Sequence, residues 1–173
     1  MLVSLTPHPD TPSTAVDRIE VHLERREERL WLRFIVHGAV DRVVWPEPVG
    51  ADRTDELWKH TCFEAFVPTH DGYREFNMSP SGQWASYHFE GYRSGMAAAD
   101  EIIDVAMLDG AGDWRAVEAE FDLPPKAFFI GLAAVIEDVD GGISYWALAI
   151  PPGKPDFHHT DSFALALPTL ELS

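Results

Sequence analysis

Residues 57–84, which read LWKHTCFEAFVPTHDGYREFNMSPSGQW, carry the clearest secondary-structure signals in the chain. Two runs within this stretch, residues 61–67 and 73–78, are rich in the aromatic and β-branched side chains that favour strands. PTHDG lies between the two runs and PSG follows the second, and both combinations are typical of turns. Because a further strand-like run follows at residues 84–89, the sequence predicts a meander of three antiparallel strands.

The register of the first hairpin stays open at this point. If residues 68–72 form the whole loop, Glu64 lies opposite Phe76, whereas a slip of one residue places Glu64 opposite Asn77. Such a slip moves every side chain to the other face of the sheet. In the second register Glu64, Glu75 and Asn77 share a face.

Further strand-like runs occur on both sides of this meander. The run at residues 128–135 is apolar at nearly every position, which is typical of a central strand buried on both faces. Residues 94–112 are less regular, and a helical turn is one reading of residues 95–99. The remaining runs occupy residues 19–23, 30–36, 40–45, 114–123 (where a helix is the alternative), 143–150 and 163–167.

About ten short strands separated by turns are typical of two packed sheets. No linker, repeat or low-complexity segment divides the sequence. We therefore predict an all-β fold, an antiparallel β-sandwich of jelly-roll or immunoglobulin-like type, formed by residues 1–173 as a single domain.

The composition restricts the class of partner. Asp and Glu number 29 against 13 Lys and Arg, which gives a formal charge of −16. Such a surface repels phosphate backbones and anionic membranes, so we expect neither nucleic acid nor a membrane as partner. The single cysteine, Cys62, excludes an internal disulfide. With no signal-peptide pattern at the N-terminus and no apolar run of about 20 residues, we expect a cytoplasmic protein.

The meander carries a combination of side chains that suits a small polar ligand. Carboxylate and amide groups at Glu64, Glu75 and Asn77 can pair with the hydroxyls of a sugar. Trp58 and Trp84, just outside the hairpin, can stack on the apolar face of a sugar ring. The sequence therefore points to a saccharide or sugar-like molecule as ligand.

Two other interpretations of the same residues remain. The tryptophans can belong to the core while the carboxylates pair with Arg74 or Arg93, since tryptophan is usually well buried. A pair of carboxyl groups about 5 Å apart can also act as acid and nucleophile in a glycoside hydrolase. No further motif supports catalysis, so Glu64 and Glu75 are not assigned a catalytic role.

The adjacent pair His158 and His159 follows Pro155-Asp156-Phe157. A metal site needs more ligands than two neighbouring histidines, so we assign no metal to them. The ordinary alternative is hydrogen bonding to the backbone or to Asp161. Haem ligation by one of these histidines with Met78 or Met96 is a second option. The loop containing Asp138 and Asp140 could hold Ca²⁺ but also has the composition of a plain hairpin turn.

Several of these motifs together resemble bacterial DOMON-like domain proteins. The resemblance rests on residues 57–66 and 73–84, on YWAL at residues 145–148 and on PDFHH at residues 155–159. It extends over about residues 15–168. More distantly, the chain is similar to carbohydrate-binding modules of family 9.

The resemblance implies a β-sandwich that holds a sugar between two tryptophans. The tryptophan and the glutamate six residues later match Trp58 and Glu64, Trp146 would be the second aromatic residue, and Arg93 a further polar contact. DOMON domains also bind haem, usually through Met with His or Lys. The His158–His159 pair has no counterpart in the sugar-binding modules, which leaves room for another ligand.

A non-catalytic module that binds a sugar or sugar-like small molecule is the leading hypothesis. The alternative is a haem- or other cofactor-binding domain that uses His and Met ligands, and the third is a glycoside hydrolase. The candidate ligand-binding residues are Trp58, Glu64, Glu75, Asn77, Trp84, Arg93, Trp146, His158 and His159.

Overall fold

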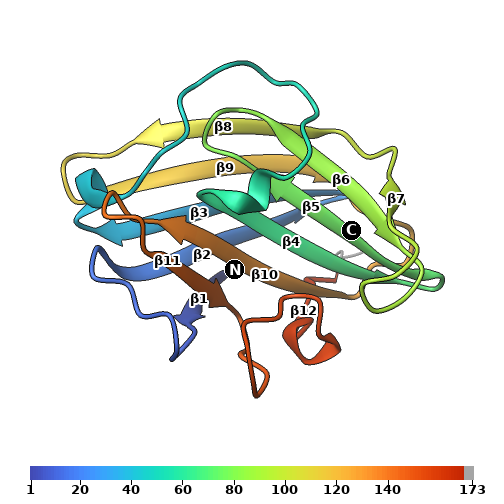
Figure 1. The fold of residues 1–173 in the computed structure, drawn as a ribbon. Coiled ribbons are helices and arrows are strands. Elements are labelled where there is room, and N and C mark those ends of the chain that lie inside the picture. Colours follow the sequence, from blue (N-terminus) through green and yellow to red (C-terminus); the bar gives the residue numbers. More distant parts are fainter. Residues whose placement is uncertain (170–173) are drawn as a thin grey trace.

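The structure is a computed structural model that describes residues 1–169. It consists almost entirely of strands, and every pair of neighbouring strands is antiparallel (Figure 1). The strands are β1 (Leu2–Pro7), β2 (Val16–Arg26), β3 (Arg29–Gly38), β4 (Cys62–Thr69), β5 (Gly72–Met78), β6 (Trp84–Phe89), β7 (Ala97–Ala98), β8 (Ile103–Asp109), β9 (Trp114–Asp122), β10 (Phe129–Glu137), β11 (Ile143–Ala147) and β12 (Leu165–Ala166).

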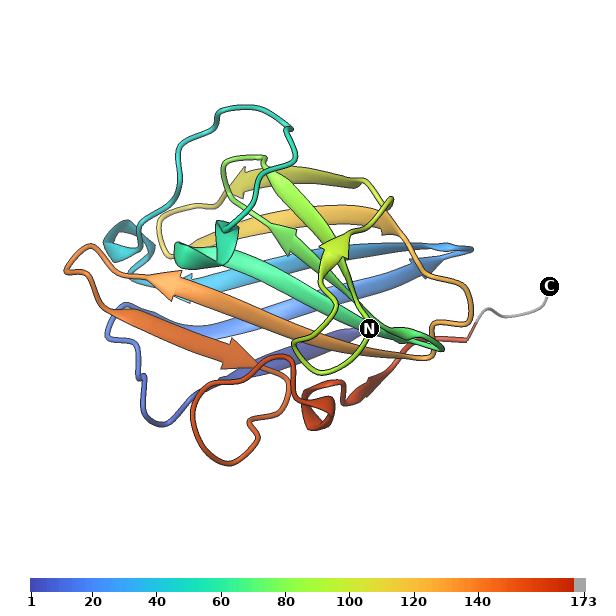
Figure 2. The same cartoon turned by 45° about the vertical axis from the view of Figure 1, so that its right-hand side comes forward.

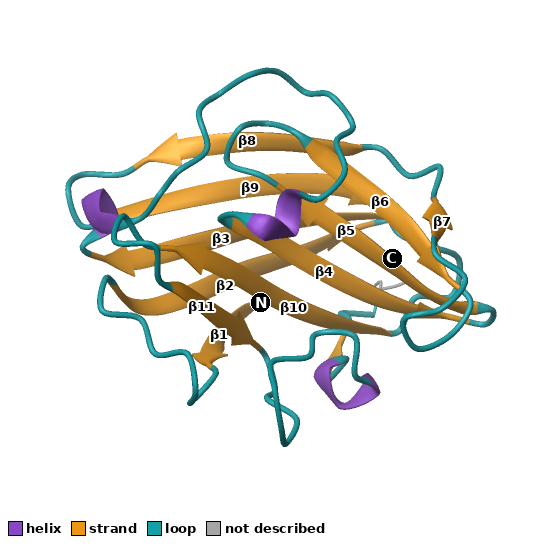
Figure 3. Ribbon diagram, viewed as in Figure 1, coloured by secondary structure: helices purple, strands orange, loops and turns teal. Residues whose placement is uncertain are grey.

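Short 3-10 helices occur at three places in the described residues (Figure 3). These are η1 (Val40–Arg42), η2 (Leu57–Lys59) and η3 (Thr160–Ser162). No helix among residues 1–169 has the length and apolar character needed to cross a membrane.

One curled sheet supplies both layers of the fold. Its strand order is β7-β6-β5-β4-β10-β11-β1-β2-β3-β9-β8, with β12 added beside β10. We call β4, β5, β6, β7, β10 and β11 the front layer, and β2, β3, β8 and β9 the back layer. β1 joins them, because its first half pairs with β2 and its end pairs with β11. In Figures 1 and 2 the strands β2 and β3 pass behind β4 and β10. The predicted all-β, antiparallel sandwich is confirmed.

The core lies between the two layers. Along β3, alternate residues from Leu30 to Val36 are fully buried, as expected when one face of a strand points inward. Phe34 meets Phe63 of the front layer with ring centroids 5.1 Å apart. Phe76 of β5 stacks on Phe121 of β9 at 4.0 Å. These contacts hold the front layer against the back layer and leave its outer face free.

The β4–β5 hairpin adopts the second of the two registers, with Glu64 opposite Asn77. Its loop is shorter than residues 68–72, because Thr69 already pairs with Gly72. The Thr69 hydroxyl donates to Asp71 Oδ1 at 2.8 Å within the turn. Gly72 has φ +134°, and a Cβ there would lie 1.8 Å from the Phe89 carbonyl oxygen, so only glycine fits.

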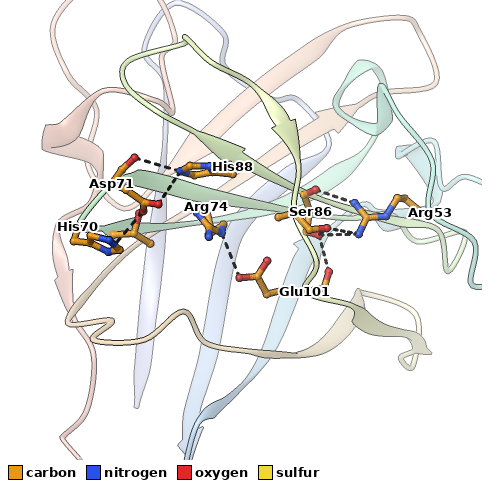
Figure 4. Close-up of polar contacts among 9 residues, drawn as sticks. Arg53, His70, Asp71, Arg74, Ser86, His88 and Glu101 are labelled. Atoms are coloured by element: carbon orange, nitrogen blue, oxygen red, sulfur yellow. Dashed lines mark hydrogen bonds and ion pairs between the residues drawn. The ribbon is translucent and has the colours of Figure 1, made fainter.

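The prediction of a helical turn at residues 95–99, after β6, is wrong. Residues 97–98 instead form β7, because partners far along the chain hold the backbone extended. Arg53 donates to the Ala99 carbonyl at 2.6 Å, and the Ser86 hydroxyl donates to the Glu101 carbonyl at 2.6 Å (Figure 4). Arg74 lies 3.3 Å from the Glu101 carboxylate. Arg74 is therefore engaged on the core side of β5 and does not pair with Glu64 or Glu75.

Three further differences concern element boundaries. Residues 103–109 form β8, an edge strand that the sequence pattern did not reveal, since most of its residues are only partly buried or exposed. The predicted strand at residues 40–45 begins as η1, in which the Val43 N–H donates to the Val40 carbonyl at 3.3 Å. Residues 114–122 form the strand β9 rather than a helix.

Candidate functional site

A cavity of about 570 Å³ opens on the outer face of the front layer. Its floor is formed by β4, β5, β10 and β11 with Phe89 at the end of β6, and its walls come from three connecting segments. These are η2, the segment between β6 and β7, and the segment between β11 and η3 (Figure 3). The cavity therefore collects side chains from parts of the chain that are far apart in sequence.

Alternation along the strands places carboxyl groups on the floor. Glu64 lies opposite Asn77, and Glu75 precedes Asn77 by two residues, so the three share a face. The neighbour of Glu64 on the other side is Ala133 of β10, which in turn pairs with Ala147 of β11. These small side chains leave space beside the Glu64 carboxyl group.

Trp58 lies at one side of the cavity, in η2 just before β4 begins. Its ring meets Tyr87 edge-on, with centroids 6.2 Å apart and an interplanar angle of 71°. The Tyr87 hydroxyl donates to Asp55 Oδ1 at 2.6 Å, which fixes the tyrosine in place. Trp58 is half-buried and lines the cavity, so part of its ring is available for stacking.

Tyr145 and Phe157 form a second aromatic wall. Tyr145 on β11 pairs with Val135 on β10, which puts both residues on the same face as Glu64. The Tyr145 and Phe157 rings meet edge-on, with centroids 5.9 Å apart at 63°. The cavity thus has an aromatic wall on each side of its polar floor.

Asp156 joins the two loops at the mouth of the cavity. Its carboxylate accepts hydrogen bonds from the Tyr92 hydroxyl at 2.5 Å, from the Arg93 guanidinium at 2.9 Å and from the backbone N–H of His158 at 3.1 Å. Arg93 has a left-handed backbone with φ 51°. Its N–H donates to the Tyr73 hydroxyl at 3.2 Å. The Arg93 charge is therefore held at the rim by an anionic partner.

His158 contacts protein groups through both ring nitrogens. Its Nδ1 lies 2.7 Å from the Tyr73 hydroxyl oxygen, which also accepts from the Arg93 N–H. Its Nε2 faces Glu75 Oε2 at 3.6 Å. Burial lowers the pKa of His158 to about 4, so the ring is neutral above that pH.

The two glutamates of the floor differ in how they are partnered. Glu64 is 3% exposed and Glu75 is 4% exposed. Glu75 Oε1 accepts a hydrogen bond from the Asn77 amide at 3.0 Å. Burial nevertheless raises the pKa of Glu75 to about 7. Burial and the neighbouring Glu75 raise the pKa of Glu64 well above its ordinary value, against the opposing effect of Arg93.

Glu64 forms no hydrogen bond or ion pair with any of residues 1–169. The Oδ1 atom of Asn77, directly across the sheet, is likewise buried without a partner among the described residues. Buried polar groups without partners are costly and uncommon in proteins. The floor therefore offers acceptor capacity that the chain itself does not use.

The structure brings most of the sequence-predicted residues together. Trp58, Glu64, Glu75, Arg93 and His158 all line the cavity. Asn77 lies beneath the surface of the floor, where it is fully buried and supports Glu75.

The prediction that Trp84 and Trp146 contact a ligand is wrong about their position. Both are 7% exposed or less and belong to the core between the layers. Trp84 pairs with Met78, one position away from Asn77, so it points to the opposite face. Trp146 likewise faces inward, and its indole N–H donates to Ser144 Oγ at 2.9 Å. The alternative assignment of tryptophan to the core is correct for these two and wrong for Trp58.

His159 also lies apart from the cavity. Its Nδ1 accepts from the backbone N–H of Asp161 at 3.1 Å and caps η3, as in the ordinary interpretation of the histidine pair. Of the two histidines proposed for the ligand site, only His158 therefore lines the cavity.

Tyr145, Lys154 and Phe157 are among the cavity residues that the sequence analysis did not propose for the site. Tyr145 and Phe157 adjoin residues that were singled out, and Lys154 lies three positions before Phe157 on the loop after β11. The signal for Tyr145 is its alternation with Trp146, since adjacent residues in a strand point to opposite faces. Using it requires the pairing of β10 with β4, which joins residues about seventy positions apart in sequence.

Of the two methionines considered for haem ligation, Met78 lies in the core on the other side of the sheet, whereas Met96 lines the cavity together with His158. Both ring nitrogens of His158 face protein groups, Tyr73 and Glu75. Asp138 and Asp140 belong to a tight turn closed by the Gly141 N–H to Asp138 carbonyl bond at 2.9 Å. Within residues 1–169 there is no group of three or more His, Cys, Asp or Glu side chains arranged to hold a metal ion.

No family model matches the chain, and no curated protein matches it. Among solved structures, the chain is similar to a carbohydrate binding module family 9 (CBM9) from Caldicellulosiruptor kristjanssonii in complex with glucose. The identity is 11% and the TM-score 0.48, over 83% of this chain and 72% of the other. A complex of such a module from the same organism with cellotriose gives 12% and 0.46, over 86% and 74%. The similarity concerns the fold, and the resemblance to DOMON-like proteins stays a prediction.

Proposed function

We propose that this chain is a non-catalytic module that binds a sugar or sugar-like small molecule in the cavity over β4 and β5. The observation that carries the proposal is the unpartnered carboxyl group of Glu64 on the floor of a cavity of about 570 Å³. That volume lies within the range of small-molecule sites, which combine apolar walls with a few polar groups.

The division between floor and walls matches the two kinds of surface on a sugar ring. Hydroxyl groups donate to Glu64 and Glu75, replacing partners that burial has removed. The apolar face of the ring stacks on Trp58 or on the wall of Tyr145 and Phe157. A ligand that is rich in donors and has an apolar face therefore complements both the floor and the walls of the cavity.

The placement of the two glutamates favours binding over hydrolysis. A glycoside hydrolase needs two carboxyl groups that flank the bond to be cleaved. Glu64 and Glu75 come from adjacent strands and project from the same floor, so both approach a ligand from one side. This arrangement suits hydroxyl recognition better than an acid and a nucleophile on opposite sides.

The proposal is tested by isothermal titration calorimetry with a panel of mono- and disaccharides. We expect saturable binding by the wild type, and Trp58→Ala to weaken it at least about tenfold, the size of one good aromatic contact. The matched control is Trp31→Ala, because Trp31 lies on the back layer beneath Arg26 and Arg33. Absence of any saccharide binding would contradict the proposal, as would equal losses in the two variants. Release of the aglycone from aryl glycosides would point to hydrolysis instead.

A further inference from the structure

We infer that the ligand of this cavity carries a primary amine, so that an amino sugar or similar polyhydroxylated amine binds in preference to the neutral sugar. The inference rests on the proposed function and names the ligand class within it. Three independent features of the cavity support the inference: the balance of donors and acceptors on the floor, the aromatic walls and the position of the cationic side chains.

The floor has more acceptors than donors. Glu75 Oε1 accepts a hydrogen bond from the Asn77 amide at 3.0 Å, and Glu75 Oε2 lies 3.6 Å from His158 Nε2. The carboxyl group of Glu64, which lines the cavity, receives no donor from the described residues. An ammonium group brings three donors and no acceptor, which is the complement of this arrangement. A hydroxyl brings only one donor, so some of the acceptor positions on the floor stay without a hydrogen bond.

The aromatic walls also favour binding of an ammonium group. Trp58 on one side and Tyr145 with Phe157 on the other line the space above the carboxyl groups. Ammonium groups are attracted to the faces of such rings, most strongly to tryptophan, when water is excluded. The aromatic walls therefore stabilise the same ligand group that the floor accepts.

The cationic side chains of the cavity lie at its mouth. Arg93 is half exposed and bound to Asp156 at 2.9 Å, so its charge is balanced at the rim. Lys154 is exposed on the loop that precedes Asp156. Both groups are therefore more solvated than the floor, and solvent screens their repulsion of an incoming amine. The gradient, acidic inside and basic outside, orients an amine toward Glu64.

Amine binding is expected to release a proton. In the free protein the pKa of about 7 keeps Glu75 partly protonated near neutral pH, burial and Glu75 raise the pKa of the neighbouring Glu64, and His158 is neutral. An ammonium group stabilises the ionised form, so the proton leaves as the ligand binds. The titratable and charged groups around this pair are Cys62, Tyr73, Tyr87, His158, Arg93 and Lys154, together with Asp156, which acts through Arg93. Affinity for the amine should therefore rise with pH from about 5 to about 7 as proton competition ends.

The experiment compares glucosamine, glucose and N-acetylglucosamine by titration calorimetry on the wild-type chain at pH 6.5. We expect glucosamine to bind at least about tenfold tighter than either neutral sugar. Repeating the titration in phosphate and in PIPES buffer, neither of which is a primary amine, should give different apparent enthalpies for glucosamine alone, which reports the released proton. Glu64→Gln should bring the ratio of glucosamine to glucose affinity close to one. Glu47→Gln, an exposed matched control, should keep the wild-type ratio.

The outcomes separate the two proposals. Glucose binding as tight as glucosamine binding overturns the amine inference and leaves the sugar-binding module standing. Failure of all three sugars to bind contradicts both. The preference and the proton release are measured on the wild type, so they decide the inference even if Glu64→Gln does not fold.

Discussion

The outer faces of the two layers both carry carboxyl groups, but these groups differ in their pairing with arginine and in their exposure to solvent. On the back layer, carboxylates lie beside arginines on neighbouring strands, and Arg29 lies 3.1 Å from Asp122. The Asp122 side chain there is 73% exposed. On the front layer, Glu64 and Glu75 are less than 5% exposed and have no arginine within ion-pair distance among the described residues.

This difference separates carboxylates that are satisfied at the surface from carboxyl groups that the described chain leaves without a partner. A carboxylate that pairs in water with a neighbouring arginine is satisfied without a ligand, and such pairs contribute little to stability. A carboxyl group buried at the base of a cavity without a counterion costs stability and gains only when something binds. The unpaired group, rather than the more abundant paired ones, is therefore the basis of the proposed site.

Removing both buried acids should have the largest effect on this contrast. Glu75 has its pKa raised from 4.5 to about 7, and each pKa unit corresponds to about 1.4 kcal/mol. The double variant Glu64→Gln with Glu75→Gln should therefore raise the free energy of unfolding by about 3 kcal/mol at pH 8. At pH 4.5 the difference should disappear, since both acids are then protonated in the folded state. Urea unfolding at the two pH values measures it.

The control for this prediction lies on the back layer. Glu118→Gln with Glu120→Gln removes two carboxylates that pair with arginines, and should lower or leave unchanged the free energy of unfolding, within about 1 kcal/mol. A stabilisation at pH 8 equal to that of the front-layer variant would show that overall charge, not burial, is responsible.

The next largest effect concerns two contributions to stability that depend on pH in opposite directions and therefore partly cancel in the wild type. Glu75 has a raised pKa, so its contribution to stability is present below pH 4.5 and lost as pH rises through about 7. His158 has a lowered pKa, so its contribution is present above pH 6.5 and lost as pH falls to about 4. The two slopes oppose each other between pH 4.5 and 6.5, each at most about 1.4 kcal/mol per pH unit.

His158→Gln should expose the slope of the carboxyl groups. Relative to the wild type, its stability should fall by up to about 1.4 kcal/mol per unit as pH rises from 4.5 to 6.5. Thermal unfolding across this range, analysed as the difference from wild type, measures the effect. His70→Gln, whose side chain is 90% exposed, should give no such difference. A rising curve for His158→Gln would contradict the assignment of opposing slopes.

The smallest effect concerns the paired charges of the back layer. Arg33 on β3 pairs with Glu118 on β9, and their side chains are 39% and 22% exposed. A double-mutant cycle with Arg33→Ala and Glu118→Ala should give a coupling of about 0.5 kcal/mol, as for other pairs in contact with water. A coupling of several kcal/mol would remove the contrast between the two faces.

Most of the fold could be predicted from the sequence because a strand with one buried face has apolar residues at every second position. The run at residues 84–89 coincides with β6 (Trp84–Phe89), and the apolar run at residues 128–135 lies mostly within the buried strand β10. β8 was missed because an edge strand with a weak burial pattern resembles a loop. The helical turn expected at residues 95–99 failed because the bonds from Arg53 and Ser86 are non-local.

The site was predictable in part for a similar reason. Glu64, Glu75 and Asn77 could be grouped on one face only by choosing a register, and the two-residue turn that selects it is set by Gly72. The tryptophans were harder, because the residue type alone does not say which face of a strand it occupies. Trp84 and Trp146 face the core while Trp58 faces the cavity.

The carboxylate of Asp156 has a consequence for the shape of the cavity. It joins the two loops at the mouth by accepting from Tyr92 and Arg93, and it accepts from the His158 backbone within its own loop. Both loops contribute residues to the cavity, so loss of this carboxylate would loosen two of its walls at once. One residue at the rim therefore sets the spacing of walls that come from parts of the chain more than sixty positions apart.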